Sequence, residues 1–129
     1  MIRELRQEEY STVNEWFIEK YKQELPFPIL PALAFCDIDL TAACWIETGQ
    51  STPAAWIMFL TANPRAEAKK VALAISHLLE ASEQICLKLG KFFMFTTSNN
   101  LSYTKFLKSK DWEAGHDITQ LSKVLCHKQ

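Results

Sequence analysis

The stretch that most constrains the fold runs from Trp56 to Gly90, where an apolar segment passes through a short turn into a long amphipathic pattern. The apolar segment ends at Asn63-Pro64, a pair typical of a turn. A strand that enters a helix through a tight turn directs free backbone N–H groups and the positive end of the helix dipole to one point. The sequence therefore predicts a strand–turn–helix unit that suits an anion, often a phosphate.

The amphipathic pattern predicts one long helix over residues 66–89, ended by Gly90. Its apolar stripe consists of Val71, Ile75, Leu78, Leu79, Ser82, Ile85, Cys86 and Leu89. His77 falls largely on the other side and is interpreted as a solvated helix residue. Residues 91–98, KFFMFTTS, predict a further buried strand. A helix of this length between two strands fits a parallel crossover.

The first half of the chain predicts a strand, a helix and a three-strand meander. Ile2 and Leu5 belong to a short first strand, and apolar residues at three- to four-residue spacing predict a helix from Gln7 to about Lys22. The meander strands are expected near 33–39, 42–48 and 54–62. The third of these is apolar almost throughout, which predicts a central position in the sheet.

Two further segments have less regular patterns. Residues 25–31, LPFPILP, contain three prolines, which exclude a regular helix. We expect an apolar loop here that either caps the core or lines a pocket. After Asn99-Asn100 we expect a short helix from Leu101 to about Lys110. A bend at 115–117 and a strand over ITQLSKVL then complete the sheet.

Composition limits the class of protein. The 129 residues carry a net charge of −1, with 48% apolar and 22% charged residues, which is ordinary for one soluble domain spanning residues 1–129. A near-neutral chain has no global field that attracts nucleic acid or an anionic membrane. It has no apolar stretch of the ~20 residues that span a membrane. The N-terminal segment lacks the apolar centre of a signal peptide, so we expect a cytoplasmic location.

The four cysteines, Cys36, Cys44, Cys86 and Cys126, lie in apolar runs and are interpreted as reduced, packed thiols. Cys36 and Cys44 could alternatively face each other across a hairpin as a redox-sensitive pair. No spacing of cysteine and histidine is typical of zinc.

The order of these elements resembles that of the GNAT family, the acetyl-CoA-dependent N-acetyltransferases, over nearly the whole chain. Locally, TANPRAEAKKVALAISHLLEASEQICLKLGKFFMFTT looks like the acetyl-CoA segment of the family, and NNLSYTKFLKSKDWEAG looks like the segment that follows it. The chain is also similar to small GNAT-like proteins of phages and prophages, which share the proline loop, an Asn-Pro after the third meander strand and a terminal T-x-L-x-K-x-L.

The resemblance implies a fold and a co-substrate. The fold is a central, mixed and mostly antiparallel sheet in β-α-β-β-β-α-β-α-β order, with helices on both faces. Acetyl-CoA is the implied co-substrate, and no metal is implied. Its pantetheine arm is expected beside the backbone of Leu60, Thr61 and Ala62. Asn100 is expected to contact the co-substrate. Its pyrophosphate is expected on the segment Lys69, Lys70, Val71, Ala72, Leu73 and Ala74. Here Ala72 and Ala74 replace the two glycines of the family's phosphate loop, which adds methyl groups where glycine allows close approach.

The resemblance also implies groups that handle protons. Tyr103 is one helical turn from the position of the usual acid and is a candidate to protonate the thiolate, with a core role as the alternative. Glu47 and Asp37 are the carboxylates nearest the expected cleft. Glu47 is the candidate base, and for both residues a solvated role is the alternative.

Two hypotheses about function remain at this point. The first is transfer of an acetyl group from acetyl-CoA to an amine or protein acceptor by direct attack of the amine. The second is an inactive GNAT-fold protein, phage-encoded in one version, that acts through a protein partner, because fold does not guarantee activity. Nucleic-acid binding through Lys105, Lys108 and Lys110 is a weak third. The chain is expected to be a monomer or a homodimer.

Overall fold

The computed structural model describes residues 1–49, 52–96, 101–109 and 112, and the chain divides into two compact units, Met1–Phe95 and Thr96–Gln129. In the first unit the elements are β1 (Ile2–Glu4), the short 3-10 helix η1 (Gln7–Glu9), α1 (Tyr10–Tyr21), η2 (Phe27–Ile29), β2 (Leu33–Asp37), β3 (Ala42–Thr48), β4 (Ala54–Ala62), α2 (Ala68–Lys88) and β5 (Phe93–Phe95). In the second unit the described element is α3 (Leu101–Ser109). One domain over residues 1–129 stays a prediction.

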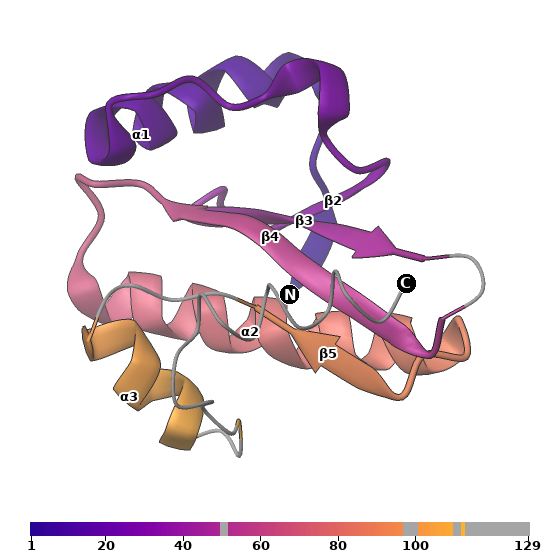
Figure 1. Cartoon of the computed structure of the whole chain (residues 1–129). Coiled ribbons are helices and arrows are strands. Elements are labelled where there is room, and N and C mark those ends of the chain that lie inside the picture. The colour runs from indigo at the N-terminus through magenta and orange to yellow at the C-terminus, as the bar shows by residue number, and fades with distance from the viewer. Residues whose placement is uncertain (50–51, 97–100, 110–111, 113–129) are drawn as a thin grey trace. The chain divides into compact units, whose positions relative to one another are not determined.

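The strands form one five-stranded sheet in the order β1-β2-β3-β4-β5. The pairs from β1 to β4 are antiparallel, and β4 pairs with β5 in parallel. Figure 1 shows α1 on one face of this sheet and α2 on the other. The predicted meander, the central position of β4 and the parallel crossover through α2 are confirmed, and the fold is the expected mixed, mostly antiparallel one. The strands predicted after residue 113 lie outside the described residues.

The pairing register assigns side chains to the two faces, because directly opposed residues of neighbouring strands share a face. On the α1 face, Val13 and Trp16 pack in one buried cluster with Cys36 and Trp45. On the α2 face, Cys86 packs in another with Ile46 and Ala55. Burial of apolar area on both faces holds the helices against the sheet.

The proline loop belongs to the α1 core. Leu25 is 2% exposed, and its backbone N–H donates to the Asn14 side chain at 2.8 Å. Leu30 packs against the same cluster, while Phe27 and Ile29 point outward and are exposed. Of the two interpretations from the sequence, the structure favours the loop as a cover for this core.

Gly90 ends α2 as predicted. Its φ of +79° is left-handed. The N–H of Lys91 donates to the carbonyl of Cys86 at 2.8 Å and that of Gly90 to Leu87 at 3.0 Å, the paired bonds of a Schellman turn. This turn carries the last helical side chains away from the sheet. The prediction that Leu89 belongs to the buried stripe is therefore wrong, because Leu89 is 51% exposed.

The segment after Gly90 differs from the prediction of a buried strand over 91–98. The strand β5 covers only Phe93–Phe95, and Phe92 and Phe93 are 74% and 59% exposed. Lys91 is buried instead. Its ammonium group donates to the carbonyl of Gly49 and, at 2.6 Å, to that of Thr52, which ties the end of α2 to the connection between β3 and β4.

The described cysteines are buried, free thiols. Burial raises the pKa of Cys36 to about 11 and that of Cys44 to about 12, so both stay protonated at neutral pH. The proposed pairing of these two thiols is wrong. Cys36 opposes Ala43 and Cys44 opposes Phe35, so the register places the two cysteines on opposite faces of the sheet.

Candidate functional site

The central strand β4 contains a β-bulge. Ala43 opposes Thr61 and Trp45 opposes Met58, so Cys44 alone stands opposite the two residues Phe59 and Leu60. Phe59 takes a left-handed φ of +56°, and the Thr61 hydroxyl donates to its carbonyl at 2.8 Å. Bulges turn the backbone locally and are frequent beside functional sites. Nothing in the sequence signals this one, because an aromatic residue is rarely left-handed.

The strands β4 and β5 pair over a short length only. Their register runs from Ala54 opposite Phe93 to Trp56 opposite Phe95. In the described part of the chain, no strand pairs with this edge of β4 from Met58 to Ala62, whereas the other edge continues to pair with β3. Among the described residues, the backbone groups of Leu60, Thr61 and Ala62 thus have no strand beside them on this edge, and such an edge can accept an extended ligand by β-type hydrogen bonds.

The connection from β4 to α2 is a tight turn held by Asn63. The Asn63 side chain accepts the N–H of Arg65 at 3.0 Å, and its carbonyl accepts the N–H of Ala66 at 3.1 Å. Arg65 also forms an exposed ion pair of 3.1 Å with Glu19 on α1. The sequence interpretation did not single out Arg65, a cationic residue in the turn itself.

The free N–H groups at the start of α2 lie earlier than predicted. The first intrahelical bond runs from the N–H of Val71 to the carbonyl of Glu67 at 3.0 Å. The N–H groups of residues 67–70 have no acceptor among the described residues, and Glu67 makes no side-chain cap. Since α2 continues through Val71, Ala72, Leu73 and Ala74, their N–H groups are used within the helix. Backbone donors for an anion are therefore those of residues 67–70.

The side chains of the same segment divide by exposure. Lys69, Lys70, Ala72 and Leu73 are exposed, Val71 is half-buried, and Ala74 is buried in the interface with the sheet. The two lysines stand where the positive end of the helix dipole adds to their charge. The replacement of glycine by Ala72 and Ala74 thus affects helical residues, and the close approach needed by a phosphate falls before them.

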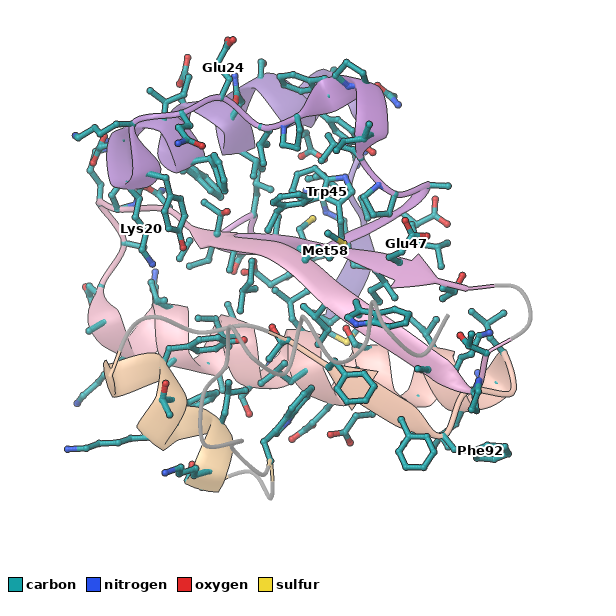
Figure 2. All side chains as sticks on the ribbon, viewed as in Figure 1. Lys20, Glu24, Trp45, Glu47, Met58 and Phe92 are labelled. Atoms are coloured by element: carbon teal, nitrogen blue, oxygen red, sulfur yellow. The ribbon has the colours of Figure 1, made fainter. Side chains whose placement is uncertain are left out.

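The two candidate carboxylates differ in environment. Asp37 is 8% exposed, faces α2, and accepts the N–H groups of Thr41 and Ala42 at 2.7 and 2.8 Å. It closes the turn between β2 and β3, where Leu40 has a left-handed φ of +54°, so the alternative of a solvated role is wrong for Asp37, because its side chain is buried in this turn. Glu47 is exposed on the α1 face, opposite Trp56. Figure 2 shows Glu47 farther along the sheet than Trp45, which lies between α1 and the strands.

The other predicted site residues lie beyond this unit. Tyr103 belongs to α3, where it is half-buried and Leu107 is buried. Its role as an acid stays a prediction. Asn100 lies outside the described residues. In the described ranges, no group of three or more acidic, histidine or cysteine side chains is close enough to hold a metal ion. None of the described helices has the length and apolar character needed to cross a bilayer.

Comparison with known proteins supports the fold assignment. No family model and no curated protein matches the sequence. Among solved structures, the chain matches one described as "Putative acetyltransferase from Agrobacterium tumefaciens str. C58" with a TM-score of 0.64 and 12% identity, covering 92% of this chain and 98% of that one. A "probable acetyltransferase" matches with a TM-score of 0.68 and 13% identity over 90% and 91% of the two chains.

A third structure, "a possible acetyltransferase from Clostridium difficile 630", matches with a TM-score of 0.61 and 13% identity over 91% and 93%. These similarities cover nearly all of each partner in the comparison. They show that this chain has a GNAT-like, mixed α/β fold. At such low identity the likeness concerns the fold, and activity has to be argued from the site.

Proposed function

We propose that this protein binds acetyl-CoA and transfers the acetyl group to an amine. The observation that supports the proposal is the edge of β4 from Met58 to Ala62, which pairs with no strand of the described residues, together with the bulge at Phe59. The acyl-pantetheine arm is extended and carries amide groups. Such a chain can hydrogen-bond with an open strand edge as an added strand does.

The start of α2 suits the phosphates of the same ligand. Four N–H groups of residues 67–70 are free, and Arg65, Lys69 and Lys70 add positive charge. The tight turn at Asn63 joins Ala62, the last residue of β4, to the first turn of α2. One extended ligand can therefore contact both the strand edge and the start of the helix. Phosphate at a helix N-terminus is a general arrangement.

The reaction needs little covalent chemistry from the protein. The neutral amine nitrogen attacks the thioester carbonyl, a C–N bond forms, the C–S bond breaks, and the sulfur takes a proton. The chain contributes position and proton transfer. Because Glu47 is opposed to Trp56 and not to the bulge, its role as the base stays a prediction, and we propose that water takes up the proton of the attacking amine. Tyr103 is the proposed acid.

The second hypothesis, a partner-binding protein of this fold without catalysis, is favoured by one observation. The residue at the N-cap of α2 is Glu67, an acidic side chain next to the free N–H groups. A carboxylate there competes electrostatically with a phosphate. Binding without transfer, or no binding at all, would support this alternative.

Calorimetry with acetyl-CoA and CoA tests the proposal. The double substitution Lys69→Glu with Lys70→Glu is expected to weaken binding at least about tenfold, as two attractive contacts become repulsive. Acidic residues in the first turn favour the helix dipole, so the fold is kept. Lys88→Glu, at the other end of α2, is the matched control and is expected to bind as the unaltered protein does.

Hydrogen exchange locates the ligand. Amides of residues 60–62 and 67–70 are expected to exchange more slowly when acetyl-CoA is added. Absence of heat at millimolar acetyl-CoA would reject the proposal. Equal affinities of the double variant and the Lys88→Glu control would move the phosphate site elsewhere. Mass detection of acetylated amines then separates an enzyme from a binding protein.

A further inference from the structure

A row of three side chains crosses the sheet on the α1 face, beyond the part that α1 covers. Glu47 on β3 is directly opposite Trp56 on β4, and Trp56 is directly opposite Phe95 on β5. Opposed residues on one face have Cβ atoms about 5 Å apart. The row thus places a carboxylate and two aromatic rings next to one another.

The two rings of the row are stacked. The ring centroids of Trp56 and Phe95 are 5.9 Å apart, with 29° between the ring planes. Because Phe95 stacks on one face of the indole from the β5 side, we infer that the other face is the one nearer β3. There the directly opposed residue is Glu47, which is exposed, while Trp56 and Phe95 are half-buried.

The space between this indole face and Glu47 has no cation from the described part of the chain. In the described residues, the ion pairs are Arg3–Glu9 and Arg65–Glu19, and the cation–π contact joins Lys20 to Tyr21, so none of these cations is paired with Glu47 or Trp56. A carboxylate next to the face of a tryptophan attracts a positive charge twice, by Coulomb attraction and through the ring quadrupole. An ammonium group satisfies both and has the hydrogen-bond donors that a carboxylate accepts.

We propose that Glu47 and Trp56, supported by Phe95, form a subsite for an alkylammonium group of the acceptor substrate. The naming of this ligand as the acceptor rests on the proposed function. Trp56 and Phe59 are three positions apart along β4, which corresponds to about 10 Å of strand. The bound ammonium is therefore not the reacting nitrogen, and the acceptor carries a second cationic group about 10 Å from the amine that is acetylated.

The binding step is tested without acetyl-CoA, by NMR of the tryptophan indole N–H signals. The Trp56 signal is assigned with Trp56→Phe. Titration with n-butylammonium is expected to shift this signal in a saturable way, whereas n-butanol, which has the same alkyl chain and no charge, is not. Glu47→Gln is expected to weaken n-butylammonium binding about fivefold. The matched control, Glu83→Gln on the exposed surface of α2, is expected to leave it unchanged.

Three results would overturn the subsite. These are an equal response to n-butanol, an unchanged affinity in Glu47→Gln, or an equal loss in Glu83→Gln. Ammonium binding without any acetyl transfer would reject the proposed function while the subsite stands. Acetyl transfer without a Trp56 response would do the reverse.

The substrate class is tested by acetyl transfer to spermidine and to n-octylamine, a monoamine of similar length. A preference for spermidine in kcat/KM is expected, and Trp56→Leu is expected to reduce this preference about three- to fivefold. The indole N–H of Trp56 does not act as an acid or base in water, so a change in the ratio reports recognition. Equal use of both amines, or an unchanged ratio in Trp56→Leu, would contradict a second cationic group in the acceptor.

Discussion

The ion pair between Arg3 and Glu9 joins the first strand to the first helix and makes stability depend on pH. Both guanidinium nitrogens of Arg3 donate to the Glu9 carboxylate at 2.8 Å, and the backbone N–H of Arg6 donates to the same group at 3.0 Å. The hydrogen bonds from Arg3, followed by that from Arg6, lower the pKa of Glu9 to about 2. The side chain of Glu9 is 15% exposed.

The magnitude follows from the pKa. An unperturbed glutamate has a pKa near 4.3, and each unit of difference between folded and unfolded chains corresponds to about 1.4 kcal/mol. A lowering of about two units therefore stabilises the folded protein by up to about 3 kcal/mol, and by about 2 kcal/mol when salt and solvent screening are allowed for. Because the folded pKa is the lower one, this stability is present above pH 5 and is lost as the pH falls toward 2.

Glu9→Gln removes the charge and isolates this contribution. We expect the variant to lose about 2 kcal/mol of unfolding free energy at pH 7. We expect the difference from the unaltered protein to shrink as the pH falls from 5 to 2. Urea unfolding followed by circular dichroism at several pH values measures both. Glu8→Gln, an exposed neighbour in the same short helix, is the control and is expected to change little. A constant difference at all pH values would refute the reasoning.

Three other predictions concern stability and thiol reactivity. Lys22 ends α1 with a left-handed φ of +60°, which is strained for a residue with a Cβ atom. Lys22→Gly is therefore expected to raise stability by about 0.5–1 kcal/mol in thermal unfolding. The control Lys22→Ala keeps this backbone strain and is expected to raise stability less. Lys91→Met leaves two carbonyls without their ammonium donor and is expected to cost about 2–4 kcal/mol in urea unfolding, whereas an equal cost for exposed Lys88→Met would contradict this. Alkylation at pH 8 followed by mass spectrometry is expected to label Cys36, Cys44 and Cys86 only after unfolding, because burial raises the pKa of their thiols. Rapid labelling of the folded protein would disprove this prediction.

The sequence predicted the central part of the fold well for physical reasons. β4 is observed at Ala54–Ala62, as expected, because a run of nine residues that is apolar except for Thr61 lies between two turn signals. Gly90 ended α2 as expected, because a left-handed residue after a helix favours glycine. Neither inference depends on distant parts of the chain.

The predictions were wrong where a neighbouring element determines whether a side chain is buried or which face of the sheet it occupies. Leu89 and Phe92 are apolar and were expected in the core, but they flank the Schellman turn and are exposed. Cys36 and Cys44 look like hairpin partners, but a shift of one residue in register changes the face.

The position of the candidate site stays a prediction, and the structure shows local details that the sequence did not indicate. Residues 60–62 were expected beside the ligand, yet the bulge at Phe59 that precedes them has no sequence signal. The free donors of α2 lie at residues 67–70 because the helix begins at Ala68, whereas the match to the family's phosphate loop had pointed to residues 69–74. Glycine spacing identifies a phosphate loop only if the start of the helix is known to within a residue or two.

The bulge in β4 also bears on how the chain folds. Without it, the register set by Ala42 opposite Ala62 would continue, and Met58 and Ile57 would exchange faces. Residues 54–60 are apolar at every position, so alternation of apolar and polar residues does not distinguish the two registers. We therefore expect the two registers to compete during folding, and we expect the parallel pairing with β5, a contact distant in sequence, to select between them. We expect a slow refolding phase whose amplitude follows substitutions at Phe59.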